Sequence, residues 1–389
     1  MEAGSLTLRQ AKDVALAGHE IGGHTFSHPD IDTLSLDEAK REICLDRENL
    51  LSLGFQVTNF AYPFASGAAV TSLVPECGYN SGRGLGGTYS EGCEGCPTTE
   101  SLRPDDLTLL KAPRQVERDW LLSDLQEAVL AAEEDGGWVI LTFHGLCPYE
   151  CDWIDVDEQL FSEFTTWLAE RTTTHNTVVR TVQEVIGGPK AAPVEGPAVL
   201  PCPPRGENGI KNPGLEQWTD KAPVCWIQAG YGINRPEFIK APGAQGSAGS
   251  RLSMLSYVDG DAKLASAQDL GTCAPAVEAG RRYSLRASYT SDVRTQFSVH
   301  YRDATGEWHF WVASPFLDPS SDFAPAEWTT PPVPDGAVAI SFGLALSDEG
   351  FLVSDDYGLY DAEFAPPVPT PAPVPSGGAT KPGEGKEAG

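Results

Sequence analysis

The sequence has few basic residues for its length, and this shortage limits the partners that it can bind. Its 389 residues include 27 lysines and arginines against 55 aspartates and glutamates, which gives a formal net charge of −28. A protein that neutralises nucleic-acid phosphates needs a basic face, and so does one that binds an anionic membrane surface. The composition therefore argues strongly against nucleic acid as a partner, and also against an anionic membrane.

Long hydrophobic runs are absent as well. No stretch of about 18 apolar residues occurs, so we expect no segment to span a bilayer. Hydrophobic residues make up 41% of the chain and charged residues 21%, which is close to the globular average and excludes wholesale disorder. The length predicts two domains joined by linkers, and we expect a monomer.

Cysteine, by contrast, is abundant, and its spacing leaves two interpretations open. Nine cysteines are typical of an oxidising compartment, in which they pair as disulfides. The close pairs Cys93/Cys96 and Cys147/Cys151 also resemble parts of a zinc site, although the second spacing is CxxxC instead of CxxC. We favour disulfides and expect Cys225 to pair with Cys273. Because nine is an odd number, one thiol is expected to be free or to have its partner outside this sequence.

The first 188 residues alternate between helical and extended patterns. Thr7 and Ser35 each begin a capping-box pattern, and Gly18 and Gly54 follow the two helices that these boxes open. The expected helices are 7–18, 35–54, 119–134 and 161–171, and the expected strands are 19–22, 59–64, 138–143 and 178–181. Helices and strands alternating in this way predict βα units with a mainly parallel sheet or barrel.

The rest of the chain has a different texture. The segment 189–206 is rich in proline and is expected to be a stiff, extended linker. From 207 to 365 short runs of Tyr, Val, Phe, Ser and Thr are separated by turn residues, which predicts an all-β sandwich. The tail 366–389 is rich in Pro, Gly and Ala and is expected to be disordered.

Two histidines form the sharpest chemical pattern in the sequence. His24 and His28 lie in the run G-G-H-T-F-S-H, directly after the expected strand 19–22. Two imidazoles four residues apart at the carboxyl end of a strand can converge on one divalent cation. The alternative interpretation is that one histidine caps a turn and the other lies on the surface.

The neighbouring residues favour the metal. The run G-H-E-I-G-G-H-T-F-S-H-P at 18–29 resembles the metal-binding motif of the polysaccharide deacetylase family, the NodB-homology carbohydrate esterases of family four. F-A-Y-P-F at 60–64 resembles the third family motif, R-x-P-[FY], and L-T-F-H at 141–144 resembles the late L-x-x-H motif. The resemblance covers residues 1–188 and implies an α/β fold, an incomplete (β/α) barrel of the NodB deacetylase type.

The resemblance implies metal-dependent hydrolysis of N-acetyl groups on a polysaccharide of the chitin, peptidoglycan or exopolysaccharide type. His24 and His28 would hold a divalent metal, expected to be Zn²⁺, and His144 would protonate the departing sugar amine. Arg83 would orient a carboxylate in the site, unless it is a surface arginine. The substrate-binding residues implied are Tyr62, Pro63, Phe64 and Arg83.

The sequence departs from the family pattern in two places. Ala61 stands where many members carry an arginine, and the first family motif, T-F-D-D-G, does not occur upstream of His24. That motif supplies the base and the third metal ligand, so the chain as written is expected to be essentially inactive. Either the sequence lacks an upstream segment with this motif and a secretion signal, or it is a degenerate relative. We favour the first, because a barrel without its first strand leaves open edges.

The ends of the second domain also carry a resemblance. N-P-G-L-E-Q-W at 212–218 and V-S-D-D-Y-G-L-Y at 353–360 resemble the ends of galactose-binding-like jelly-roll carbohydrate-binding modules. This implies an all-β jelly-roll sandwich that binds sugar, with Glu216 and Asp356 as candidate ligands of a structural Ca²⁺. The expected protein is a secreted deacetylase fused to this module. The alternative is a non-catalytic secreted carbohydrate-binding protein with a degenerate deacetylase scaffold.

Overall fold

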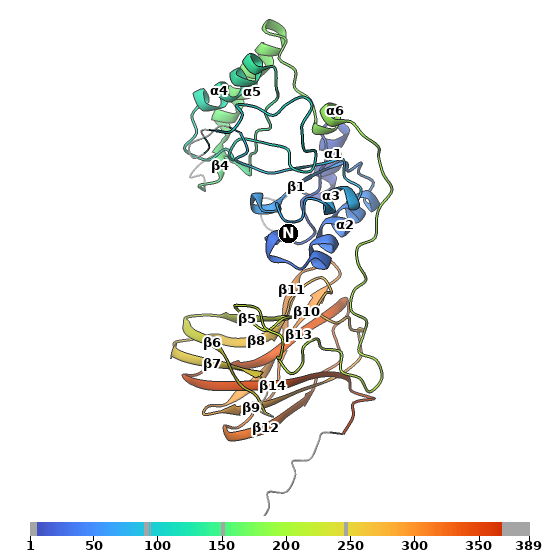
Figure 1. The fold of residues 1–389 in the computed structure, drawn as a ribbon, viewed down its shortest axis with the longest axis vertical. Helices are drawn as coiled ribbons and strands as arrows, with labels where there is room; N and C mark the ends of the chain where they lie inside the picture. Colours follow the sequence, from blue (N-terminus) through green and yellow to red (C-terminus); the bar gives the residue numbers. More distant parts are fainter. Residues whose placement is uncertain (1–5, 89–92, 94, 149–151, 245–247, 368–389) are drawn as a thin grey trace, which may run out of the picture.

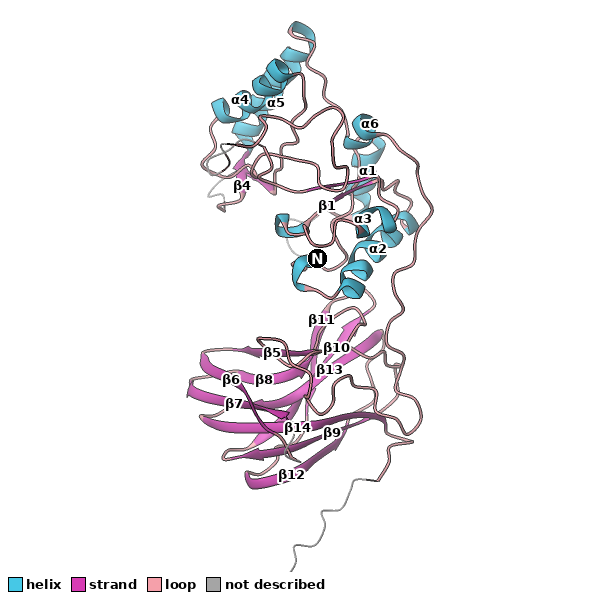
Figure 2. Ribbon diagram, in the orientation of Figure 1, coloured by secondary structure: helices cyan, strands magenta, loops and turns pink. Residues whose placement is uncertain are grey.

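The computed structural model describes residues 6–88, 93, 95–148, 152–244 and 248–367. The chain forms an α/β part, a β-sandwich, and an extended segment that runs between them (Figure 1). Helices occur only in the first part of the described chain, and long strands only in the second (Figure 2). The order of a helical domain followed by an all-β domain agrees with the sequence prediction.

Local signals place the helices of the first part. Thr7 caps the first helix and forms the expected capping box with Gln10, and Ser35 accepts a hydrogen bond from Glu38 N at the start of the second. Short 3₁₀ turns lie at Ile31–Thr33 and Pro63–Ala65. The helices are α1 (Leu8–Leu16), α2 (Leu36–Ser52), α3 (Leu73–Glu76), α4 (Leu122–Asp135), α5 (Glu158–Thr174) and α6 (Val182–Ile186).

The first half of this part contains a short parallel sheet. Strand β1 (Asn59–Ala61) pairs in parallel with β2 (Ser81–Arg83). Parallel bridges join Gly23 to Phe60 and Arg83 to Leu110, so four segments lie side by side in chain order. Helix α2 precedes β1 and helix α3 precedes β2, which is the predicted βα pattern.

The strand predicted at 19–22 is not formed, and the single bridge there lies at Gly23, so this prediction was wrong. The strands predicted at 138–143 and 178–181 are not formed either, and these predictions were also wrong. Within the described residues, the first has only a single antiparallel bridge, between Glu100 and Trp138, and the second has no ladder. Instead β3 (Gly145–Cys147) pairs in parallel with β4 (Asp155–Asp157). An extended segment becomes a strand only beside a partner, and the described chain offers none here. The barrel is therefore incomplete, with one small core around Ile43 and Phe60 and another around Leu125 and Phe164.

The β-sandwich is formed by two antiparallel sheets of five strands each, as the sequence predicts. Their orders are β11-β10-β13-β8-β5 and β12-β9-β14-β7-β6, and apolar side chains such as Phe297, Phe342 and Leu285 fill the space between them. The strands are β5 (Trp226–Tyr231), β6 (Asn234–Pro242), β7 (Ala248–Tyr257), β8 (Asp261–Ser266), β9 (Tyr283–Ser291), β10 (Thr295–Asp303), β11 (Trp308–Ala313), β12 (Ser320–Thr329), β13 (Ala337–Leu346) and β14 (Gly350–Asp361).

The linker is extended, as predicted, but it is also held along its length by two buried arginines of α2. Arg47 donates hydrogen bonds to the carbonyl oxygens of Ala191 at 2.7 Å and Ala192 at 2.9 Å. Arg41 donates to those of Pro197 at 3.0 Å and Ala198 at 2.6 Å. The linker is thus part of the folded structure and not a free tether.

The cysteines form disulfides, so the zinc interpretation of the close pairs was wrong. The pairs are Cys44–Cys77, Cys93–Cys96 and the predicted Cys225–Cys273. Cys147 is also disulfide-bonded, whereas Cys151 lies outside the described residues. Among the described cysteines, Cys202 alone is free.

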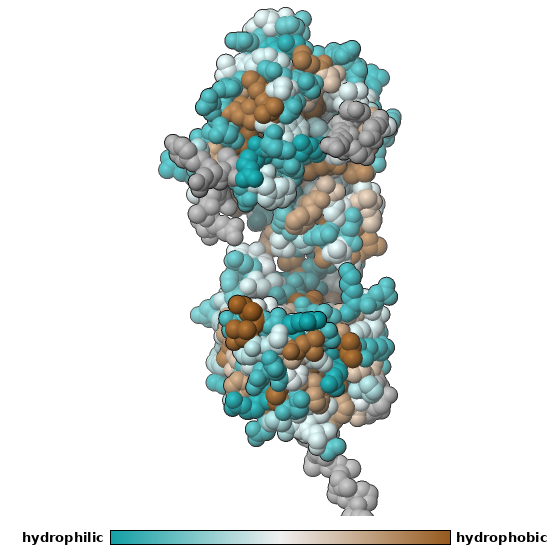
Figure 3. All heavy atoms as spheres, turned by 90° about the vertical axis from the view of Figure 1, so that its left-hand side faces the viewer, coloured by the Kyte–Doolittle hydropathy of each residue, from teal (hydrophilic) through white to brown (hydrophobic). Residues whose placement is uncertain are grey.

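The surface is largely polar, with separate apolar patches on both parts (Figure 3). Within the described residues, no helix has the length and apolar character needed to cross a bilayer. The predicted disordered tail lies outside the described residues from position 368 onward.

Candidate functional site

The predicted site residues of the first domain meet in one cavity. It has a volume of about 1340 Å³, and its walls come from both halves of the α/β part. The six predicted residues that line it are His24, His28, Tyr62, Phe64, Arg83 and His144. Residues that lie up to 120 positions apart in the sequence thus line one cavity.

His24 and His28 face each other across a tight turn. Their Nε2 atoms are 3.1 Å apart, and Thr25 and His28 adopt left-handed backbone angles, with φ of 68° and 59°. His24 Nδ1 lies 2.8 Å from the carbonyl oxygen of Ala61, so Nδ1 donates a proton there and Nε2 keeps its lone pair. With metal–nitrogen bonds of about 2.05 Å, this spacing corresponds to an angle of about 98° at a shared cation. The pair fits two sites of one metal.

Electrostatics keep His24 in the form that a metal requires. Burial is the main cause that lowers the pKa of His24, and the nearby charges of His28, Arg83 and His144 lower it further. A metal ligand must be a neutral imidazole, so a lowered pKa favours binding near neutral pH.

Two buried carboxylates of α2 hold the histidine turn in place. Asp46 accepts hydrogen bonds from His24 N at 2.9 Å and from the Tyr79 hydroxyl at 3.1 Å. Burial raises the pKa of Asp46 to about 6. Glu42 accepts the backbone N–H groups of Phe26 and Ser27 at 2.9 and 2.8 Å. Sequence reasoning missed both residues; the available signal was acidic residues four apart on the apolar side of the α2 pattern.

Arg83 lies in the cavity and not on the outer surface. It follows Ser81 and Gly82 on β2 and pairs directly with Ala61 of β1, whose carbonyl oxygen holds His24. The side chain is half-buried, and burial lowers its pKa. Within the described residues Arg83 has no carboxylate partner, so its charge is available to a group in the cavity.

His144 lies on the opposite wall, in the loop before β3. Its ring is exposed, and its charge acts on His24. No described residue forms a hydrogen bond with this ring. A general acid benefits from a carboxylate partner, and the described residues do not provide one.

The predicted wall of Tyr62, Pro63 and Phe64 is reduced to one exposed ring. Tyr62 is 3% exposed, and its hydroxyl donates to the carbonyl oxygen of Thr108 at 2.7 Å. Pro63 is also buried. Phe64, with a φ of 55°, points outward, is 67% exposed and contacts His28 with ring centroids 4.8 Å apart. The chain turns sharply after β1, so Phe64 is the one exposed side chain of the three, and the buried Tyr62 contributes only to the cavity wall.

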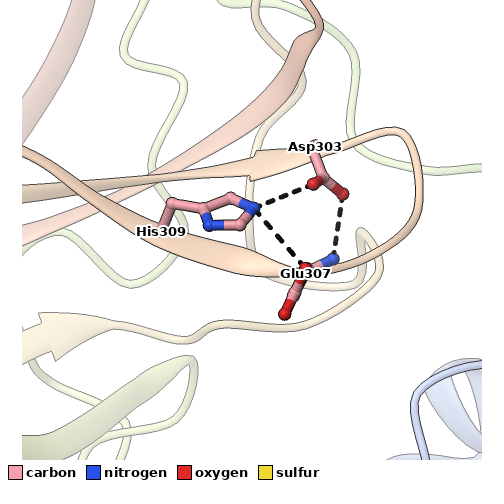
Figure 4. Close-up of side chains that lie close together, drawn as sticks. All are labelled: Asp303, Glu307 and His309. Atoms are coloured by element: carbon pink, nitrogen blue, oxygen red, sulfur yellow. Dashed lines mark hydrogen bonds and ion pairs between the residues drawn. The ribbon is translucent and has the colours of Figure 1, made fainter. Parts of the chain in front are cut away.

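A three-ligand cluster does occur among the described residues, but it lies elsewhere. Asp303, Glu307 and His309, on the hairpin between β10 and β11, offer ligand atoms within 4.8 Å of one another (Figure 4). Asp303 accepts hydrogen bonds from Thr305 and from Glu307 N, and its other oxygen lies 2.8 Å from His309 Nε2. These contacts close the hairpin turn. His24 and His28 have no third histidine, cysteine or carboxylate ligand within the described residues.

Glu216 and Asp356, the candidate calcium ligands, make separate hydrogen bonds, and a calcium site at these residues stays a prediction. Glu216 contacts Ala248 N at 3.3 Å, whereas Asp356 is exposed and accepts from Ser288 Oγ. The buried carboxylate here is Asp355, which accepts Ala244 N at 2.9 Å. An irregularity in β14 between Asp355 and Gly358 turns the first side chain inward and the next outward.

Comparison with known proteins gives one family match and several structural likenesses. No curated protein matches the chain. One similar solved structure is the enzymatically active domain of tailspike protein 4 of bacteriophage CBA120, with 15% identity, a TM-score of 0.30 and coverage of 39% of this chain and 21% of that one. Another contains xylanase 10B modules of Clostridium thermocellum, with 15% identity, a TM-score of 0.27 and coverage of 35% of this chain and 26% of that one. A third is the family 11 carbohydrate-binding module of Clostridium thermocellum, with 14% identity, a TM-score of 0.26 and coverage of 36% of this chain and 90% of that one. The chain thus spans about a fifth of the tailspike structure and about a quarter of the xylanase structure.

The family match falls on the segment that contains the histidine turn. The profile that matches is polysaccharide deacetylase, over residues 7–81, which include His24, His28 and Phe64. Arg83 and His144 lie beyond the matched segment. Residues 7–81, about a fifth of the chain, are therefore similar to the polysaccharide deacetylase family.

Proposed function

We propose that this chain is a metal-dependent polysaccharide N-deacetylase, a hydrolase of carbon–nitrogen bonds, acting on an N-acetylated polymer outside the cell. The observation that carries the proposal is the pair of Nε2 atoms 3.1 Å apart, inside a deacetylase segment and in one cavity with Arg83 and His144. The disulfides fit an oxidising compartment, which supports secretion.

Each residue of the cavity has a role in this proposal. His24 and His28 hold the divalent metal, with Zn²⁺ as the first candidate. When bound, such a metal polarises the acetamide carbonyl and lowers the pKa of a bound water toward about 7. His144 gives a proton to the departing amine, and Arg83 stabilises negative charge that develops on the acetyl group. Phe64 offers an apolar face to the sugar ring.

The ligand set limits the rate that we expect from residues 1–389. Catalytic zinc normally has three protein ligands, and the described residues supply two. No described carboxylate stands beside the pair as a base, and loss of a general base removes roughly 10²–10⁴-fold in rate. We therefore propose that acetate release by residues 1–389 is roughly 10²–10⁴-fold slower than by a site with three ligands and a base, which is the near-inactivity that the sequence predicts. The same observation favours a second candidate function, carbohydrate binding without catalysis.

Acetate release from N-acetyl chito-oligosaccharides, with Zn²⁺, Co²⁺ or Mn²⁺ added, separates the two candidates. The deacetylase proposal predicts slow release that disappears in His24→Ala and His144→Asn and persists in His175→Ala, a matched control because His175 is exposed at the end of α5. Absence of release with all three metals would contradict the enzyme and favour the binding protein.

A further inference from the structure

A second pocket lies where the two domains meet. It has a volume of about 590 Å³, within the range of small-molecule sites. One wall is the histidine turn and α2, and the other is the 268–270 segment with the turn 305–308 between β10 and β11. His28 lines both this junction pocket and the cavity of the candidate site. The two spaces are therefore neighbours that share a metal-site residue.

Buried contacts fix the walls of the junction pocket relative to each other. Glu38 of α2 accepts hydrogen bonds from Leu270 N and Thr272, and it pairs with Arg41 at 3.0 Å, with both side chains under 10% exposed. Gly306 packs on Phe26, since a Cβ at Gly306 would lie 2.4 Å from Phe26 Cε1. The sandwich domain therefore contacts the histidine turn directly, and the pocket is formed before any ligand binds.

The lining of the junction pocket determines which ligand it accepts. Its charged residues are carboxylates, and none of the described residues that line it is a lysine or arginine. Glu38, Glu42 and Asp269 are each occupied by hydrogen bonds within the protein. The remaining acidic residue is Glu307, whose side chain is 76% exposed and whose only described ion-pair partner is His309 at 3.9 Å.

Next to Glu307, the half-buried indole of Trp308 also lines the pocket. A carboxylate beside an aromatic ring binds a neutral sugar well, because the carboxylate accepts hydroxyl hydrogen bonds and the ring packs against the pyranose. The same lining disfavours an anion, because its described residues include four carboxylates and no lysine or arginine, and the nearby cations are already engaged, Arg41 by Glu38 and Arg302 by the carbonyl oxygen of Asp269.

We propose that the junction pocket is a sugar subsite that binds a neutral unit of the polymer whose N-acetyl group reaches His24 and His28. This inference rests on the proposed function and narrows its substrate class. It selects uncharged N-acetylated polymers, of the chitin kind, over polymers that carry carboxylates. It also gives the β-sandwich a role at the reacting end of the substrate.

Calorimetric titration of the metal-free full chain with N-acetyl chitohexaose tests the subsite. Trp308→Ala is expected to weaken binding about tenfold, which equals about 1.4 kcal/mol, and Trp308→Phe is expected to retain most of the affinity. Phe323→Ala is the matched control, because Phe323 is an exposed ring on β12 in the other sheet. Equal affinity of Trp308→Ala and wild type, or no binding of the hexamer by wild type, would overturn the proposal.

Charge selection gives a second, independent arm. The wild-type chain is expected to bind an oligosaccharide with carboxylate groups at least tenfold more weakly than the neutral one, and Glu307→Lys is expected to narrow that gap. Equal binding of both sugars by wild type would overturn the proposal. Folding of each variant is checked by its thermal unfolding midpoint.

Zn²⁺ binding measured by equilibrium dialysis distinguishes failure of the subsite from failure of the proposed function. If the protein binds Zn²⁺ through His24 but Trp308→Ala does not change the sugar affinity, the subsite proposal is refuted and the deacetylase proposal stands. If Trp308→Ala weakens sugar binding but no Zn²⁺ binds at His24, the subsite proposal stands and the proposal of a metal-dependent enzyme is refuted.

Discussion

The buried pair Glu38–Arg41 holds the two domains together, and its removal gives a measurable prediction. Glu38 receives hydrogen bonds from Leu270 N, Thr272 N and Thr272 Oγ1, all from the sandwich domain, as well as from Arg41. In Glu38→Gln one carboxylate oxygen becomes an NH₂ group, which cannot accept these bonds. The charge of Arg41 then remains buried without its partner.

The size of the effect follows from the burial of the pair. Both side chains are under 10% exposed, and breaking one partner of a buried ion pair costs about 3–5 kcal/mol. The exposed pair Arg114–Glu117 is the matched control, because it has the same i, i+3 spacing with side chains 48% and 26% exposed. Glu117→Gln is expected to cost at most about 1 kcal/mol.

Urea unfolding followed by tryptophan fluorescence measures the two variants, and limited proteolysis reports on the linker. Glu38→Gln is expected to lower the free energy of unfolding by about 3–5 kcal/mol and to speed cleavage within 189–206. The double variant Glu38→Leu/Arg41→Met is expected to lose less than Glu38→Gln alone, since neither charge is left unpaired. Equal stability of Glu38→Gln and Glu117→Gln would refute the rigid junction.

Three further predictions concern single features of the fold. Replacing Cys44 and Cys77 by alanine removes the disulfide that closes a loop with a sequence separation of 33. Chain entropy predicts that the free energy of unfolding, measured with denaturant, falls by about 4 kcal/mol. Cys202→Ser, at the free thiol, is the control and is expected to leave this free energy unchanged. Tyr62→Phe is expected to lower the free energy of unfolding by about 1 kcal/mol, because the hydrogen bond to Thr108 is lost. Phe64→Ala is expected to leave this free energy unchanged and to raise KM for acetate release. A stability loss in Phe64→Ala with a raised KM in Tyr62→Phe would contradict the roles given to the two rings. The hydrogen bond from Arg171 is the main cause that lowers the pKa of Glu133, to about 2. A lowered carboxyl pKa contributes stability that is present above pH 4.5 and lost as the pH falls toward 2. The difference in free energy of unfolding between wild type and Glu133→Gln should therefore shrink over that interval. A difference that stays constant with pH would count against the Glu133–Arg171 pair.

The sequence allowed prediction of features that depend on neighbouring residues. Thr7 and Ser35 cap their helices because the capping pattern spans only four residues. His24 and His28 meet because they lie four positions apart in one tight turn. The cavity with Arg83 and His144 followed from the order of βα units and from the family resemblance.

Features that depend on distant partners could not be predicted. The burial of Glu38 and Arg41 depends on Thr272, which lies more than 200 positions later in the sequence. Asp355, and not Asp356, is buried near Glu216, where β14 is irregular between Asp355 and Gly358. The 138–143 and 178–181 segments have strand-like sequences, but strand formation requires a neighbour that the described chain does not provide.

The most direct test of the central claim is a Co²⁺ titration of the full chain followed by visible absorption. We predict one bound ion whose absorption bands disappear in His24→Ala and in His28→Ala, and persist in His309→Ala, which removes the other histidine-containing cluster. Bands that survive in both turn variants and vanish in His309→Ala would place the metal on the β10–β11 hairpin and contradict the account.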